Sequence, residues 1–142
     1  MKAVMPATEF DDEITSVVAT LGSLVRAPAI VTASATPIAE LRRMLAQRRV
    51  PAIAIVDRDE LRGIVTRTDV LRAEPDAIAA DVMSGFVFAL PATAAIEKAA
   101  ALMAYEGVGQ VVVVGDRGAL VGMVSAVDIA RHLAVIAGYL RE

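Results

Sequence analysis

The strongest constraint on the fold is a short sequence that occurs twice. GIVTRTD at residues 63–69 returns as GMVSAVD at residues 122–128, an offset of 59 (122 minus 63). Both copies carry a glycine, two apolar residues, a hydroxyl side chain and, three positions later, an aspartate. Upstream, TPIAELRRMLAQRRV (36–50) matches the apolar pattern of AAIEKAAALMAYEGV (94–108) at an offset of 58. A 142-residue chain with this internal repeat is predicted to fold as two similar halves.

Both halves predict the same order of elements. A short apolar run, residues 29–31 or 87–90, is typical of a strand. A helix with one apolar stripe follows, with Thr36 and Thr93 as its predicted N-caps. Two strands joined by a polar turn come next, at residues 52–56 and 61–66, then at 110–114 and 120–125. A second helix closes each copy, so the prediction is an α/β (α+β) fold with tandem β-α-β-β-α units.

The remaining segments set the predicted boundaries. Apolar residues from Phe10 to Leu21 share one helical face, and Gly22 ends the pattern, which predicts an extra N-terminal helix over residues 1–22. The first repeat then covers residues 23–73. A linker helix and the second repeat cover residues 74–142. The last helix repeats its apolar residues at spacings of four, three and four from Ile129 to Leu140.

Composition limits the function classes. The chain has 14 basic and 17 acidic residues, a net charge of −3, which argues against a nucleic-acid partner. Four arginines, at positions 42, 43, 48 and 49, form a basic group typical of a solvated helix face. Cysteine is absent, so disulfides and thiolate chemistry are excluded. The N-terminal sequence lacks the apolar run of a signal peptide, and no uncharged stretch is long enough to span a membrane, so the expected location is the cytoplasm.

Nothing in the sequence indicates catalysis or a metal site. His132 is the single histidine, and it has no companion nucleophile or orienting group in the pattern. The sequence contains no HExxH, P-loop or GxSxG motif, and no glycine-centred calcium loop. We therefore expect neither an enzyme nor a metal centre.

The repeated heptad suggests chemistry for half of a nucleotide site. Thr66 stands where a strand ends and a helix begins, and the first backbone N–H groups of a helix lack partners within it. A phosphate at that position gains several donors, including the hydroxyl. Asp69, three residues later, is an acceptor suited to the vicinal hydroxyls of a ribose. Gly63 has no Cβ and allows close approach of a backbone or a flat ring.

The same residues have a second interpretation. A threonine followed three positions later by an acid is also the pattern of a helix capping box. Its recurrence follows from simple duplication, which demonstrates common origin more firmly than it demonstrates ligand binding. Both interpretations stay open on the sequence alone.

The tandem unit, each copy ending in glycine, two apolar residues, Ser or Thr, two spacers and Asp, resembles a pair of cystathionine-β-synthase (CBS) domains, also called a Bateman module. The resemblance covers about residues 23–137, and the strand VPAIAIVD and the segment DVMSGFVFAL resemble the family's usual phrases. It implies two units packed about a pseudo-twofold axis with clefts that bind adenosine-containing ligands: AMP, ADP, ATP or S-adenosylmethionine. No other cofactor is required.

The resemblance also implies roles for particular residues. In the first copy Thr66 would reach phosphate, Asp69 would hold ribose, and Arg67 could pair with phosphate. The adenine would lie along Pro51, Ala52 and Ile53, with Ala29 and Ile30 opposite. The second copy offers Ser125, Asp128, Gly109, Gln110 and Val111, with Val87 and Phe88 opposite. Arg67 aligns with Ala126, so the two clefts differ, and Arg131 could partly compensate.

Two function classes follow from the resemblance. The first is a regulatory sensor that binds an adenosine-type nucleotide and signals to a partner protein. The second is a ligand-free interaction module that provides only a dimer surface. In both, the last helix and the helices of Met44 and Met103 carry apolar surface that suggests a homodimer.

Overall fold

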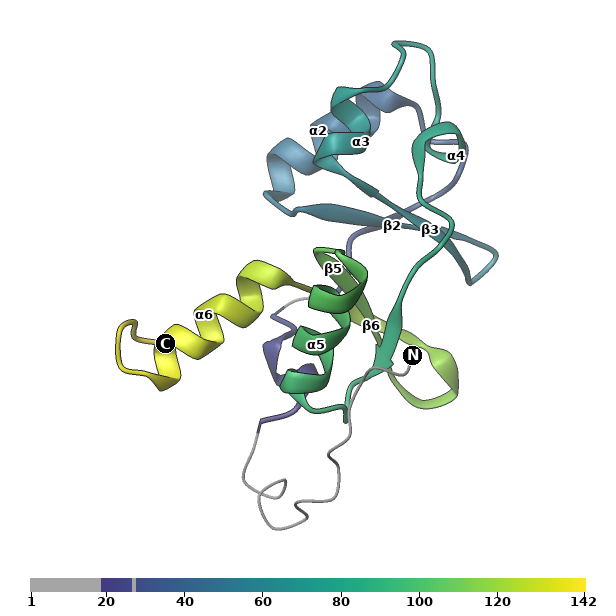
Figure 1. The fold of residues 1–142 in the computed structure, drawn as a ribbon. Helices are drawn as coiled ribbons and strands as arrows, with labels where there is room; N and C mark the ends of the chain where they lie inside the picture. The colour runs from purple at the N-terminus through teal and green to yellow at the C-terminus, as the bar shows by residue number, and fades with distance from the viewer. Residues whose placement is uncertain (1–18, 27) are drawn as a thin grey trace. The chain divides into compact units, whose positions relative to one another are not determined.

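The computed structural model describes residues 19–26 and 28–142, and it divides into two compact units (Figure 1). The repeat-one unit is Ala29–Val87. The repeat-two unit joins Phe88–Glu142 to the described residues up to Pro28. Most of the N-terminal helix expected over residues 1–22 lies outside the described residues. Of its end, Leu21–Leu24 form a short 3₁₀ helix, η2.

The repeat-one unit is a three-stranded sheet covered by helices. Its strands are β1 (Val31–Thr32), β2 (Ala52–Asp57) and β3 (Glu60–Thr66), in the order β1-β2-β3. β1 is parallel to β2, and β2 and β3 form an antiparallel hairpin. The helices are α2 (Ile38–Arg48), α3 (Arg67–Leu71) and α4 (Ala79–Val82). α2 and α3 lie side by side over the sheet (Figure 1).

The repeat-two unit has the same plan. Its sheet order is β4-β5-β6, formed by β4 (Ala89–Pro91), β5 (Gln110–Val114) and β6 (Leu120–Ser125). Its helices are α5 (Ile96–Glu106), the 3₁₀ turn η3 (Asp116–Gly118) and α6 (Ala126–Ile136). The pairing is again parallel and then antiparallel, with a register shift near the end of the first hairpin strand in both units. The predicted tandem β-α-β-β-α fold is therefore confirmed.

Each unit has its own apolar core, built from the helix stripe and alternate strand residues. In the repeat-one unit, Ile38 and Leu41 of α2 are fully buried against Ile53, Ile55 and Val65 of the sheet. The repeat-two unit buries the corresponding residues, which are Ile96, Ala99, Val111, Val113 and Val124. Met103 is also buried in this core. Burial at both helical and alternating spacing explains why the element order could be predicted.

Each of the two segments that precede a repeat packs into the core of the other repeat. The first leading segment, residues 20–25, packs with the repeat-two unit: Leu21 N donates to Ala94 O at 2.8 Å, and Leu21 is fully buried. The second leading segment, residues 78–83, packs with the repeat-one unit, where Ala79 N donates to Thr36 O at 2.8 Å. Leu21 and Ala79 are 58 positions apart, the offset of the repeat, so they hold equivalent places.

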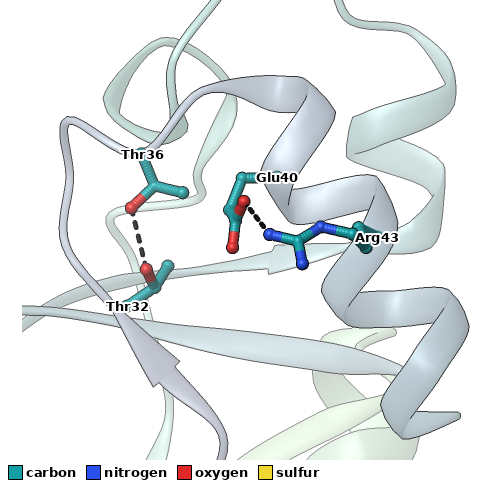
Figure 2. A network of polar contacts seen from close by, with 4 residues as sticks. All are labelled: Thr32, Thr36, Glu40 and Arg43. Atoms are coloured by element: carbon teal, nitrogen blue, oxygen red, sulfur yellow. Dashed lines mark hydrogen bonds and ion pairs between the residues drawn. The ribbon is translucent and has the colours of Figure 1, made fainter.

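The predicted N-caps Thr36 and Thr93 are wrong. The N-cap residues of α2 and α5 are Pro37 and Ala95, and neither makes a side-chain cap hydrogen bond. Thr36 lies before the cap position, and its Oγ1 is 2.8 Å from Oγ1 of Thr32 (Figure 2). This hydroxyl pair ties the end of β1 to the start of α2. Near it, Glu40 and Arg43 form an ion pair along the exposed side of α2 (Figure 2).

Asp57 at the end of β2 makes the repeat-one unit sensitive to acid. Its Oδ1 accepts a hydrogen bond from Ser34 N at 3.0 Å, and Arg62 lies 3.9 Å from Oδ2. The hydrogen bond from Ser34 is the main cause that lowers the pKa of Asp57, and Arg62 adds to it. A carboxyl whose pKa falls on folding stabilises the fold above its unfolded-state pKa, about 3.9. That contribution is lost as pH falls through the lower, folded-state pKa.

We expect Asp57→Asn to flatten the pH dependence of stability in this acid range and leave the neutral range with a smaller, pH-independent loss. Urea denaturation at a series of pH values from neutral to strongly acidic measures it. An acid slope identical to that of the unchanged protein would contradict this role for Asp57.

Candidate nucleotide-binding site

Thr66 and Asp69 form a closed pair at the start of α3. Thr66 is the N-cap, with extended backbone. Asp69 N donates to Thr66 Oγ1 at 3.3 Å, and Thr66 N donates to Asp69 Oδ2 at 2.7 Å. This is the reciprocal capping box that the sequence offered as its second interpretation. The hydroxyl and the carboxylate are therefore held in a fixed geometry at the end of β3.

Ser125 and Asp128 repeat this arrangement at the start of α6. Asp128 N donates to Ser125 Oγ at 3.1 Å, and Ser125 N donates to Asp128 Oδ2 at 2.8 Å. Ser125 is buried, with 7% of its surface exposed. Two units thus hold a hydroxyl and a carboxylate in the same way at the same point in the fold.

The two carboxylates differ in their second oxygen. Within residues 19–26 and 28–142, Oδ1 of Asp69 takes part in no hydrogen bond or ion pair, so it can accept from a ligand hydroxyl while Oδ2 keeps the cap. Oδ1 of Asp128 lies 3.6 Å from Arg131 Nη1. A ligand at Asp128 would share that oxygen with a guanidinium. Arg131, which was expected to compensate partly for the missing arginine at position 126, forms an ion pair with Asp128 in the structure.

The strand residues expected at each site lie at the same end of the hairpin as the hydroxyl. Ala52 is the antiparallel partner of Thr66, and Gln110 is the partner of Ser125. Pro51 and Gly109 immediately precede these strands, and both are exposed. Gly109 O accepts from Ala126 N at 3.0 Å, which joins the start of β5 to the start of α6.

The first strand of each unit brings the opposing residues to this neighbourhood. Ile30 O accepts from Ala54 N at 2.9 Å, and Phe88 O accepts from Val112 N at 2.9 Å. Ala29 and Val87 precede these residues along the chain. In each unit the parallel strand pairing therefore gathers the residues that the sequence placed on both sides of an adenine.

Two expected site residues point elsewhere. Ile53 is fully buried and Val111 is 1% exposed, and both side chains belong to the apolar core of their unit. Side chains alternate between the faces of a strand, so these two lie on the helix-covered face. Their side chains are therefore not available to a ligand. At these two positions, for which the resemblance implied a base contact, the apolar side chains serve core packing.

Arginines connect the end of α2 to the start of α3 in the repeat-one unit. Arg67 Nε donates to Val50 O at 3.4 Å, and Arg42 Nη2 donates to Val70 O at 3.3 Å. The sequence suggested Arg67 but treated Arg42, Arg48 and Arg49 as a solvated face. The signal that would have identified them is the aligned second repeat, which has no basic residue at any of these positions.

Other kinds of site are not found in the described part of the chain. No group of three His, Cys, Asp or Glu residues there could hold a metal ion. In residues 19–26 and 28–142, every helix is too short or too polar to cross a lipid bilayer.

Comparisons with known proteins identify the family. The family model described as CBS domain matches twice, at residues 21–76 and 79–135. A CBS domain protein from Pyrobaculum aerophilum complexed with AMP has a TM-score of 0.75 and 25% identity, covering 84% of this chain and 97% of that one. The CBS domain pair of protein MJ0100, in complex with 5′-methylthioadenosine and S-adenosyl-L-methionine, has a TM-score of 0.75 and 25% identity, covering 80% and 98%.

A curated relative agrees with this. The chain is 31% identical over 94 residues to inosine-5′-monophosphate dehydrogenase of Thermoplasma acidophilum; the match covers 66% of this chain and 19% of that enzyme. The chain thus spans about a fifth of its curated relative. The two family matches cover both repeats and most of their length, and they coincide with the two β-α-β-β-α units. The chain belongs to the CBS domain family.

Proposed function

We propose that this CBS pair is a cytoplasmic regulatory module that binds an adenosine-containing nucleotide in the cleft between its repeats. AMP, ADP, ATP or S-adenosylmethionine is the proposed ligand. Binding would be signalled to a partner protein, and the chain itself would not be an enzyme. The observation that carries the proposal is the hydroxyl and carboxylate pair, which recurs with the same geometry in both units.

The chemistry of the pair supports an adenosine ligand. Asp69 keeps one carboxylate oxygen for acceptance from ribose hydroxyls, and the Thr66 hydroxyl can donate to a phosphate oxygen. Pro51 lies at the same strand end, and its exposed ring offers an apolar surface to the base, while the adjacent Ala52 is buried. The similar structures that contain AMP, or 5′-methylthioadenosine with S-adenosylmethionine, share adenosine as the common part of their ligands.

The proposal is tested by nucleotide titration of Asp69→Ala. We expect AMP and ATP to raise the melting temperature of the unchanged protein, because a ligand that binds only the folded state stabilises it. Loss of a charged acceptor is expected to weaken binding at the first site by roughly tenfold or more. Isothermal calorimetry measures the affinity, and Asp128→Ala examines the second site in the same way.

A matched control separates binding from stability, because Asp69 also caps α3. Asp81→Ala removes an equivalent contact in the same unit, where Asp81 Oδ2 accepts from Ile78 N at 2.9 Å. Each substitution is expected to cost about 1 kcal/mol of unfolding free energy. Asp81→Ala should nevertheless keep full nucleotide affinity. Equal affinity of the Asp69→Ala and Asp81→Ala proteins would contradict a binding role for Asp69.

The ligand-free interaction module is the second candidate, and one observation favours it. Both aspartates are already engaged by their own backbone, and Asp128 also faces Arg131. A protein that showed no thermal shift with any of AMP, ADP, ATP, S-adenosylmethionine or NADH would support this candidate.

In both candidates we propose a homodimer formed through α6. The helix expected to run to Leu140 ends at Ile136, so the stripe that includes buried Ile129 continues on α6 as Leu133 and Ile136, which are 55% and 65% exposed; Leu140, 50% exposed, lies beyond the helix. Such a continuous apolar face is typical of a contact surface. Light scattering coupled to size exclusion is expected to show a dimer, and Ile136→Asp to shift it to monomer. Val127→Asp is the control, because Val127 is exposed on the opposite side of α6. A dimer that survives Ile136→Asp would contradict this surface.

A further inference from the structure

The repeat-one unit carries a cluster of arginines that its duplicate lacks. The arginine cluster is Arg42, Arg48, Arg49 and Arg67, and all four are exposed. α2 and α5 are both 11 residues long and start 58 positions apart, so their residues correspond one to one. At the corresponding positions the repeat-two unit has Ala100, Glu106, Gly107 and Ala126. Four positive charges in one unit are replaced by one negative charge in the other.

Among the described residues, no acidic side chain pairs with these four cations. Within residues 19–26 and 28–142, the ion pairs of arginines are those of Arg43, Arg62 and Arg131. Two members of the cluster are instead held by carbonyl groups, Arg67 by Val50 and Arg42 by Val70. Positively charged side chains that lie close together repel one another, and a bound anion reduces that repulsion.

The cluster lies at the end of the unit that holds the proposed site. Arg48 and Arg49 directly precede Val50, whose carbonyl receives Arg67, and Pro51 and Ala52 follow at once. Ala52 is paired with Thr66. Three members of the cluster, Arg48, Arg49 and Arg67, therefore border the hydroxyl and the carboxylate of the first site, and Arg42 lies further along α2.

Arg49 has a backbone conformation that is unfavourable for a residue with a side chain. It ends α2 with φ 55°, a left-handed conformation, where the corresponding residue of repeat two is Gly107 with φ 70°. Glycine is the favoured residue there because a Cβ makes this conformation unfavourable. Repeat one therefore carries an arginine at the border of the proposed site where repeat two carries the conformationally favoured glycine.

On the basis of the proposed function, we propose that the two sites are sorted by ligand charge. The repeat-one site takes an adenine nucleotide with a long phosphate chain, ADP or ATP, whose phosphates meet the arginine cluster. The repeat-two site, with Ala126 and Glu106 at its border and Asp128 paired to Arg131, takes an adenosine ligand with little or no negative charge, such as S-adenosylmethionine. Guanidinium groups bind phosphate through charge-assisted hydrogen bonds, which are stronger than hydrogen bonds between neutral groups.

The test compares ATP with AMP at one site at a time. Calorimetry of the full chain uses Asp128→Ala to weaken the second site, and Asp69→Ala to weaken the first, in buffer with EDTA so that magnesium does not neutralise the phosphates. In the Asp128→Ala protein we expect ATP to bind roughly tenfold more tightly than AMP, with an affinity that falls as salt rises. In the Asp69→Ala protein we expect no preference for ATP, and S-adenosylmethionine to bind at least as well.

Arginine variants identify the groups responsible. Arg67→Ala and Arg49→Gly each give repeat one the residue that repeat two has, and both are expected to bring the ratio of ATP to AMP affinity toward one. Arg58→Gly is the matched control: Arg58 also has a positive φ, 52°, but it lies in the turn between β2 and β3, at the other end of the hairpin. It loses the same charge and the same backbone strain, and it should keep the ratio unchanged.

The outcomes separate this inference from the proposed function. Equal ATP and AMP affinity in the Asp128→Ala protein overturns the sorting by charge and leaves nucleotide binding standing. If inorganic tripolyphosphate competes as well as ATP, the sorting is overturned too, because the arginine cluster would then bind any polyanion without recognising the nucleoside. Absence of binding by every nucleotide overturns both.

Discussion

Gly63→Ala is expected to lower the unfolding free energy of the repeat-one unit by about 3 kcal/mol, the upper part of the usual range for overpacking. A Cβ built on Gly63 would lie 2.4 Å from Ser84 O and 3.1 Å from Met83 Sδ. The closer atom belongs to the backbone and cannot turn aside. Ile64 N and Ser84 N each donate to the other residue's carbonyl, at 3.1 and 2.9 Å, so these two hydrogen bonds hold the backbone of Ser84 at this distance from β3.

Urea denaturation of the purified protein measures this loss. Gly85→Ala is the control, because the nearest atom to its added Cβ is Arg62 O at 3.9 Å, an ordinary contact. If the two variants have the same stability, the close approach at Gly63 is not a constraint on the fold. The sequence singled out Gly63 for close approach of a backbone or a flat ring, and in the structure the close neighbour is a backbone, that of Ser84.

Leu21→Ala is expected to cost about 3 kcal/mol, within the usual range for removing a buried leucine side chain. Leu21 has no exposed surface, and it packs among Leu90, Ile96 and Val113. The damage should fall on the repeat-two unit, although Leu21 precedes the first repeat. Hydrogen exchange localises it: faster exchange is expected in α5 and β5, and unchanged exchange in β2.

Leu71→Ala is the control for Leu21→Ala. Leu71 is 81% exposed, so the same change of side chain is expected to alter stability by no more than about 0.5 kcal/mol. Faster exchange in the repeat-one unit of the Leu21→Ala protein, with the repeat-two unit unaffected, would contradict the packing of the first leading segment.

Much of the fold follows from patterns that are local in sequence. The helix stripe that begins at Ile38 and the continuous apolar run around Ile53 both indicate burial, and each recurs in the second repeat. The destinations of Leu21 and Ala79 could not be predicted, because their partners lie far along the chain and single apolar residues carry no periodicity. The caps expected at Thr36 and Thr93 failed because a hydroxyl near a helix start can bond elsewhere, as Thr36 does with Thr32.

The candidate site was predictable to a similar degree. The spacing of Thr66 and Asp69 predicted both the cap and a ligand contact, and the structure confirms the cap. The resemblance to CBS domains implied a base contact for Ile53 and Val111. Their burial shows that apolar character alone cannot tell which face of a strand a side chain occupies.

The placement of the leading segments has a consequence for how such a protein can arise. Each core is completed by the segment that precedes the other copy, as Leu21 and Ala79 show. A gene encoding a single copy would therefore satisfy its core only by exchanging that segment with a second molecule. Tandem duplication converts the exchange into an event within one chain, at the high effective concentration of a tether. The unit that is inherited and the unit that folds are consequently different stretches of the same polypeptide.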